Sequence, residues 1–119
     1  PSTRVANAVI DDKKVKIKQL TLKERMKMLS KVRYHQVLAD KLATTEDPEG
    51  NIAVDFIERV SKMVIEGIES IEGVENIVDY VNNLTDESKL RDLSKFIVDA
   101  NWPTIVEVKN SESSASIPS

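Results

Sequence analysis

The sequence predicts a mainly α, single-domain protein of about four helices, with a short N-terminal strand or a two-stranded β element beside them. Three observations favour this fold class. Apolar residues recur at 3- and 4-residue intervals in four stretches, helix-starting and helix-ending residues separate these stretches, and 119 residues is close to the common size of one domain. We expect a flexible lead-in over residues 1–12, the helical domain over 13–109, and a serine-rich disordered tail over 110–119.

The first helix is expected over residues 22–43. Thr21, followed three residues later by Glu24, has the pattern of a capping box, which starts a helix. The side chains expected to face the core are Leu22, Met26, Leu29, Val32, Leu38 and Leu42. Before this helix, residues 15–18 alternate apolar and basic side chains, which predicts a short half-buried strand. The β-branched residues 104–108 are a candidate partner strand.

Three further helices are expected along the chain. The second is capped by Asn51 and ends at Gly73, a common helix-terminating residue. Its core face is expected to consist of Ile57, Val60, Val64, Ile68 and Ile71. The third is expected over residues 74–81. The fourth starts at Thr85, a favourable N-cap, and ends before Pro103 because proline disfavours a helical residue in front of it.

The chain is electrically divided. Residues 1–43 hold 11 Lys or Arg and 4 Asp or Glu, a net charge of +7, whereas residues 44–119 hold 6 and 16, a net charge of −10. Opposite charges at the two ends can attract copies head to tail, can equally meet one partner with each end, and can pair with each other within the chain. We expect a homo-oligomer. Surface ion pairs add little affinity, so we expect apolar side chains such as Met28 and Tyr34 to supply most of it. The candidate self-association surface consists of Lys23, Arg25, Lys27, Met28, Lys31, Tyr34, Glu66, Glu69 and Glu72, with the three glutamates in one row on the second helix.

The residue types argue against an enzyme, a cofactor site or a metal site, and we expect none of these. The chain has no cysteine, and its one histidine, His35, lies partly on the apolar side of the first helix, where a structural or interface role is expected. Glu66, Glu69 and Glu72 lack the E-x-x-H helices that a di-iron bundle needs. No apolar run approaches the roughly 20 residues of a membrane-spanning helix, and the first residues do not resemble a signal peptide. We therefore expect a cytoplasmic protein without a membrane partner.

Nucleic acid is the other partner that the basic first third of the chain suggests. Lysines and arginines over residues 13–41 could contact phosphates. The whole chain is acidic, however, with an isoelectric point of about 5.2, and no short turn with a recognition helix follows the first helix. We expect no meaningful binding to duplex DNA. A small nucleic-acid-associated regulatory protein that uses the basic first helix is kept as the alternative function, and an enzyme that uses carboxylates alone as a third.

The start of the first helix resembles a known family. A short charged strand over residues 14–18 leads into residues 20–26, LTLKERM, which are similar to the L-T-L/F-x-x-R start of helix 1 in the tail assembly chaperones of long-tailed bacteriophages. The long first helix, the acidic helices and the polar end also follow the layout of that family.

The resemblance implies a predominantly helical fold, self-assembly into rings or spirals, and binding of the tape measure protein during tail building in the host cytoplasm. In this family a longer form is often made by ribosomal frameshifting near the C-terminus. The polar end from residue 110 resembles the region where such forms diverge.

Overall fold

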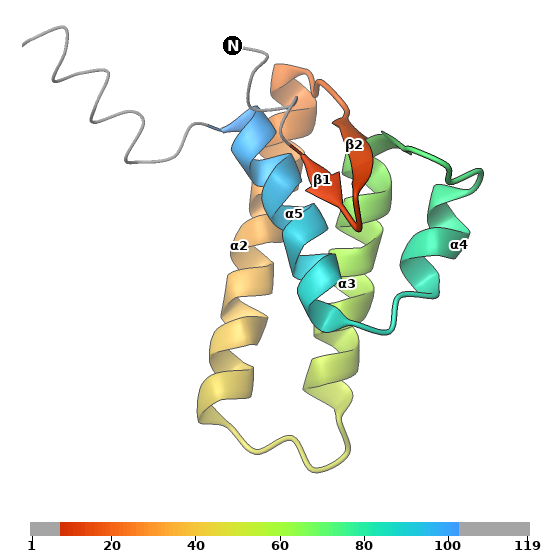
Figure 1. Ribbon diagram of the computed structural model, residues 1–119. Helices are drawn as coiled ribbons and strands as arrows, with labels where there is room; N and C mark the ends of the chain where they lie inside the picture. Colours follow the sequence, from red (N-terminus) through yellow and green to blue (C-terminus); the bar gives the residue numbers. More distant parts are fainter. Residues whose placement is uncertain (1–7, 103–119) are drawn as a thin grey trace, which may run out of the picture.

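The computed structural model describes residues 8–102. In chain order the elements are β1 (Val9–Ile10), β2 (Lys13–Ile17), α2 (Leu22–Thr44), α3 (Asn51–Gly67), β3 (Ile68–Ile71), α4 (Ile77–Asn82) and α5 (Glu87–Asn101). The four helices and the small sheet within these residues confirm the mainly α, single-domain prediction. Figure 1 shows α3 between α2 and α4, with α5 across the front and the sheet at the end where α2 begins and α3 ends.

The sheet has three antiparallel strands in the order β1-β2-β3. The strand predicted over residues 15–18 is part of β2. Asp11 and Asp12 join β1 to β2 with positive φ angles of 50° and 64°, the left-handed backbone that a two-residue hairpin turn of type I′ requires. Because Ala8 and Ile10 are buried in the core, residues 8–12 belong to the domain. The predicted lead-in over residues 1–12 was therefore too long.

The start of α2 confirms the predicted capping box. The Thr21 backbone N–H donates to Glu24 Oε1 at 2.9 Å, and the Glu24 N–H donates to Thr21 Oγ1 at 3.2 Å. The predicted core face of this helix was wrong in its first two turns. Leu22 and Met26 are 66% and 50% exposed, whereas Met28 is 4% exposed and packs in the core. Apolar residues lie on both sides of α2, so their spacing did not show which side meets α3.

The second helix ends earlier than predicted. It stops at Gly67, and residues 68–71 form β3, which pairs with β2 through Ile17 with Ile68 and Val15 with Ile71. Both isoleucines are buried as predicted, but in the sheet instead of on a helix. In a regular strand residues i and i+3 point to opposite faces, so the spacing alone favours a helix. The register shift opposite Lys16 and Ile17 places both isoleucines on the buried side of β3, and pairing with the free edge of β2 satisfies the strand's backbone.

The other helix starts differ from the predictions by one to three residues. The carboxylate of Asp47, and not Asn51, accepts hydrogen bonds from the free N–H groups at the start of α3. α4 begins after Asn76, and α5 begins after Asp86 instead of Thr85. α5 ends at Asn101, close to the predicted stop before Pro103.

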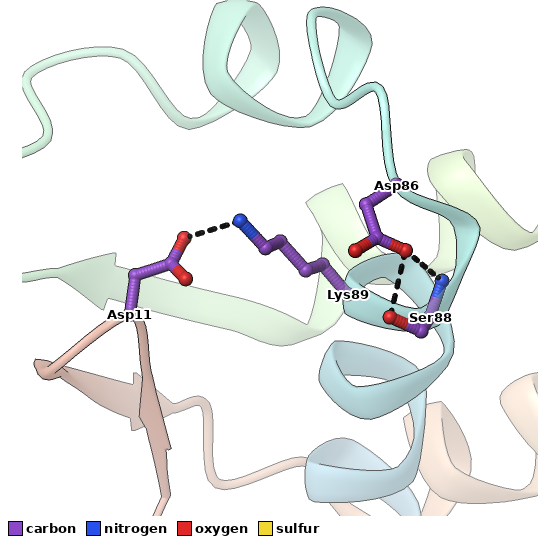
Figure 2. A network of polar contacts seen from close by, with 4 residues as sticks. All are labelled: Asp11, Asp86, Ser88 and Lys89. Carbon is purple, nitrogen blue, oxygen red and sulfur yellow. Dashed lines mark hydrogen bonds and ion pairs between the residues drawn. The ribbon is translucent and has the colours of Figure 1, made fainter.

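The core joins α3, α5 and the sheet. Its fully buried side chains include Met63 and Val64 on α3 and Leu93 and Ile97 on α5. An ion pair also attaches α5 to the hairpin, since Lys89 Nζ lies 2.9 Å from Asp11 Oδ2, as Figure 2 shows. The candidate strand over 104–108 and the tail over 110–119 lie outside the described residues.

Candidate interaction surfaces

The first candidate surface is the outer face of α2, which we define by Leu22, Met26, Leu29 and Val37. These residues follow one another at intervals of four, three and eight, which places them within a sector of about 80° around the helix. Leu22, Met26 and Val37 are exposed and Leu29 is half-buried. The side chains that α2 buries lie on its other side, so the α2 outer face is an apolar stripe without a partner among the described residues.

Basic side chains lie beside and within this stripe: Lys23 and Lys27 are on one side of it, and Arg33 lies inside the sector, between Leu29 and Val37. Lys23, Lys27 and Arg33 are exposed, and none of them forms an ion pair with another residue of the described range 8–102. Two of the three, Lys23 and Lys27, belong to the surface predicted from the sequence. The α2 outer face therefore combines apolar contact area with positive charge that is free to meet an acidic partner.

Other predicted interface charges meet inside the chain. Lys31 Nζ lies 2.8 Å from Glu66 Oε1, and Lys16 Nζ lies 3.0 Å from Glu69 Oε2. Glu72 Oε1 accepts a hydrogen bond from a backbone N–H of β2 at 3.3 Å. The predicted glutamate row does not exist as one helix face, because Glu66 is on α3, Glu69 is on β3 and Glu72 follows β3. The break of the helix at β3 causes this difference.

Two other predicted surface residues are held within the fold. Met28 is in the core, so it cannot supply contact area on the surface. Arg25 is half-buried, and its Nη1 donates to the backbone oxygen of Asn101 at 3.1 Å. The Asn101 side chain in turn accepts from the Leu20 N–H at 3.3 Å and donates to the Ile97 oxygen at 3.0 Å. Arg25 and Asn101 together attach the start of α2 to the end of α5.

Tyr34 and His35 border a basic cavity of about 270 Å³ between α2 and α3. Tyr34 is exposed, and the Arg59 guanidinium lies over its ring at 4.7 Å from the centroid. His35 is buried and contacts Phe56 edge to face, with ring centroids 6.5 Å apart. Burial lowers the pKa of the His35 imidazole below its usual value, and Arg59 and Lys31 lower it further. His35 thus packs as an uncharged structural side chain at neutral pH.

The second candidate surface is an open groove of about 540 Å³ beside α3, which we call the α3–α5 groove. One side is α3, and the other is formed by α4, the following loop and the start of α5. Its large apolar lining residues are Ile57, Ile65, Val81, Leu84 and Leu90. The exposed Val54 lies one helical turn before Ile57 and Glu58 on α3 and extends the apolar strip.

The rim of the α3–α5 groove is acidic. Glu58, Asp86 and Glu87 lie on it, and Lys62 is the one cation among its lining residues. Glu87 forms an ion pair with Arg91 on α5, whereas Glu58 and Asp86 form none with another residue of the described range. Figure 2 shows Asp86 at the start of α5, where its Oδ1 accepts from the Ser88 hydroxyl at 2.7 Å and from the Ser88 N–H at 2.9 Å. These hydrogen bonds hold the pKa of the Asp86 carboxyl below its usual value, so this part of the rim stays negative at neutral pH.

The described residues offer two further findings. None of their helices has the length and apolarity that a membrane crossing requires. Within 8–102, no three His, Cys, Asp or Glu side chains cluster closely enough to hold a metal ion.

Comparison of the chain with protein-family models, with curated proteins and with solved structures finds no match.

The sequence contained a pattern that indicates the first surface, but the prediction assigned the residues of this pattern to the core. Leu22, Met26 and Leu29 were assigned to the core, but with Val37 they form a stripe of their own beside a second apolar set, Met28, His35 and Leu38. Where the core covers only one of two apolar sides of a helix, the uncovered side is a candidate for binding a partner. The groove had no such signal, because three elements far apart in sequence form it.

Proposed function

We propose that this protein is a non-enzymatic tail assembly chaperone of a long-tailed bacteriophage, which self-associates in the host cytoplasm and binds the tape measure protein during tail morphogenesis. The observation that carries the proposal is the α2 outer face, a stripe of exposed apolar side chains on a 23-residue helix. Exposed apolar side chains gathered with charged ones on one face of a helix are typical of sites that bind other proteins. The resemblance of residues 20–26 to the family supplies the identity of the client.

The surroundings of the stripe favour protein over nucleic acid as the partner. Surfaces that bind phosphates are polar and strongly positive. Here Glu69 and Glu66 neutralise Lys16 and Lys31, and the remaining free basic side chains of α2 border apolar residues. Such a surface suits a helix or groove that presents apolar side chains with acidic flanks.

Co-expression with the tape measure protein encoded in the same genome tests the proposal. The wild-type chain is expected to co-purify with that protein and keep it soluble. Alone, at tens of micromolar, it is expected to scatter light as a species larger than its 13.3 kDa chain mass. The double variant Leu22→Asp with Met26→Asp is expected to lose both properties. Val9→Asp is the matched control, since it changes a comparably exposed apolar residue on β1.

The outcomes separate the parts of the proposal. A wild-type chain that stays monomeric at low and physiological salt and leaves the tape measure protein insoluble overturns it. Retention of a DNA fragment at 150 mM salt, lost in a Lys23→Glu and Lys27→Glu variant, would instead favour the alternative of a small nucleic-acid-associated regulator. Arg25 is left unchanged in that variant because its hydrogen bond to Asn101 is part of the fold.

A further inference from the structure

We infer that the chain self-associates head to tail, with the α2 outer face of one copy packed in the α3–α5 groove of the next. This inference rests on the self-association proposed above and names its two surfaces. Both surfaces combine apolar side chains with charged ones, and the charges are basic on the α2 outer face and mainly acidic on the groove rim. Each surface thus carries the sign of charge that the other lacks.

The shapes of the two surfaces match. The α2 outer face is convex, and Leu22 and Met26 project from it as its most exposed large apolar side chains. The groove is concave and has Ile57 and Ile65 on the α3 side, with the small Ser61 between them. A serine at the centre leaves room for the backbone of a second helix to approach, while the isoleucines contact its side chains.

Charge selects this pairing over a symmetric one. Two α2 outer faces packed against each other would bring Lys23, Lys27 and Arg33 close to the same residues of the other copy, and like charges at an interface are costly. Against the groove, the same side chains meet Glu58 and Asp86, since Glu87 is already paired with Arg91. The basic residues from the first part of the chain then belong to one binding surface, and the acidic residues from the later part belong to the other.

The positions of the surfaces allow the contact to repeat. Figure 1 shows α2 and α4 on opposite sides of α3. The α2 outer face belongs to α2 alone, and the groove is lined by α3, α4 and the start of α5, so the two surfaces share no residue. A copy can therefore bind one neighbour through each surface at the same time. A head-to-tail contact of this kind closes into a ring when the rotation per copy permits and otherwise continues as a spiral.

Complementation between two variants tests the inference. Leu22→Asp with Met26→Asp removes the stripe and keeps the groove, and Ser61→Arg fills the groove and keeps the stripe. Each variant alone is expected to be monomeric by light scattering, with a dissociation constant raised about tenfold or more. Mixed in equal amounts, they are expected to form a complex of twice the 13.3 kDa chain mass that grows no further, because each copy retains one working surface.

The controls keep the test decisive. Glu58→Lys reverses an exposed rim charge that forms no ion pair within the described residues, so it weakens assembly without touching the core. Circular dichroism melts confirm that each variant is folded. If Ser61→Arg and Glu58→Lys assemble like the wild type, the groove is not the acceptor, and self-association stands while the head-to-tail inference falls. Two monomeric variants that do not combine when mixed overturn it as well. A monomeric wild-type chain overturns the self-association itself.

Discussion

The contact between α3 and α5 at Gly67 gives the sharpest stability prediction. A Cβ atom at this position would lie 2.6 Å from Ile97 Cδ1, 2.9 Å from Cγ2 and 3.0 Å from Cγ1, well inside the roughly 3.5–4.0 Å of a favourable carbon–carbon contact. Ile97 is fully buried in a close-packed core, so a shift of its side chain disturbs its neighbours. Gly67→Ala therefore displaces the Ile97 side chain from its packed position or moves α5 away from α3.

Two opposing effects set the magnitude. Overpacking a core costs about 1–3 kcal/mol. Replacing glycine by alanine in a helix gains at most about 1 kcal/mol, a gain that applies here because Gly67 has no positive φ angle. Three side-chain atoms are too close instead of one, so we expect the clash to dominate and the free energy of unfolding to fall by about 1–2 kcal/mol.

A double-mutant cycle with Ile97→Ala tests the cause. Urea unfolding is measured for the wild type, both single variants and the double variant, at concentrations where the midpoint does not depend on protein concentration. Ile97→Ala alone is expected to cost about 2–5 kcal/mol. In the double variant the added Cβ occupies part of the vacated space, so the loss should be smaller than the sum by about 1–3 kcal/mol. Additivity within about 0.5 kcal/mol, or a more stable Gly67→Ala chain, would refute the reasoning.

Two further predictions concern α2. Met28→Ala is expected to lower the free energy of unfolding by about 2–5 kcal/mol, whereas the neighbouring Met26→Ala should change it by no more than about 0.5 kcal/mol; equal effects in denaturation curves would mean that the core face is misassigned. Because the pKa of His35 is lowered by burial and by Arg59 and Lys31, the unfolded chain binds a proton more readily. The contribution of uncharged His35 to the free energy of unfolding is then complete above the usual pKa of 6.5. It is lost as the pH falls through the lower pKa that His35 has in the folded chain. His35→Gln should therefore flatten the fall in urea stability between pH 7.5 and 5.5, and an unchanged slope would contradict the assignment.

Features set by neighbouring residues were predictable. The Thr21–Glu24 capping box starts α2 where predicted, because both of its hydrogen bonds join residues three apart. The start of β1 was missed, although the pair Asp11-Asp12 offered a signal, since aspartate tolerates the left-handed backbone of a tight hairpin turn better than most residues. A turn at these two residues would have predicted a strand before it.

The candidate surface was predicted only in part, since burial and pairing depend on contacts between distant residues. Lys23 and Lys27 are on the exposed side of α2 as expected, but Met28 is in the core and Met26 is exposed in its place. Lys31 meets Glu66 within the same chain, 35 residues away. The sequence showed that these charges would attract one another, and it did not show whether they would do so within one copy or between two.

By itself, the sequence determined the helical class, the first and last helix limits to within two residues, and the separation of positive from negative charge, because each depends on composition or on hydrogen bonds between near neighbours. Only the tertiary structure decided which side of α2 faces outward, where α3 gives way to β3, and how α3, α4 and α5 enclose the groove. The helix limits depend on local backbone interactions. The other three depend on contacts between distant parts of the chain. α3 covers one of the two apolar sides of α2, the free edge of β2 pairs with residues 68–71, and α5 packs beside α3, where Ile97 meets Gly67.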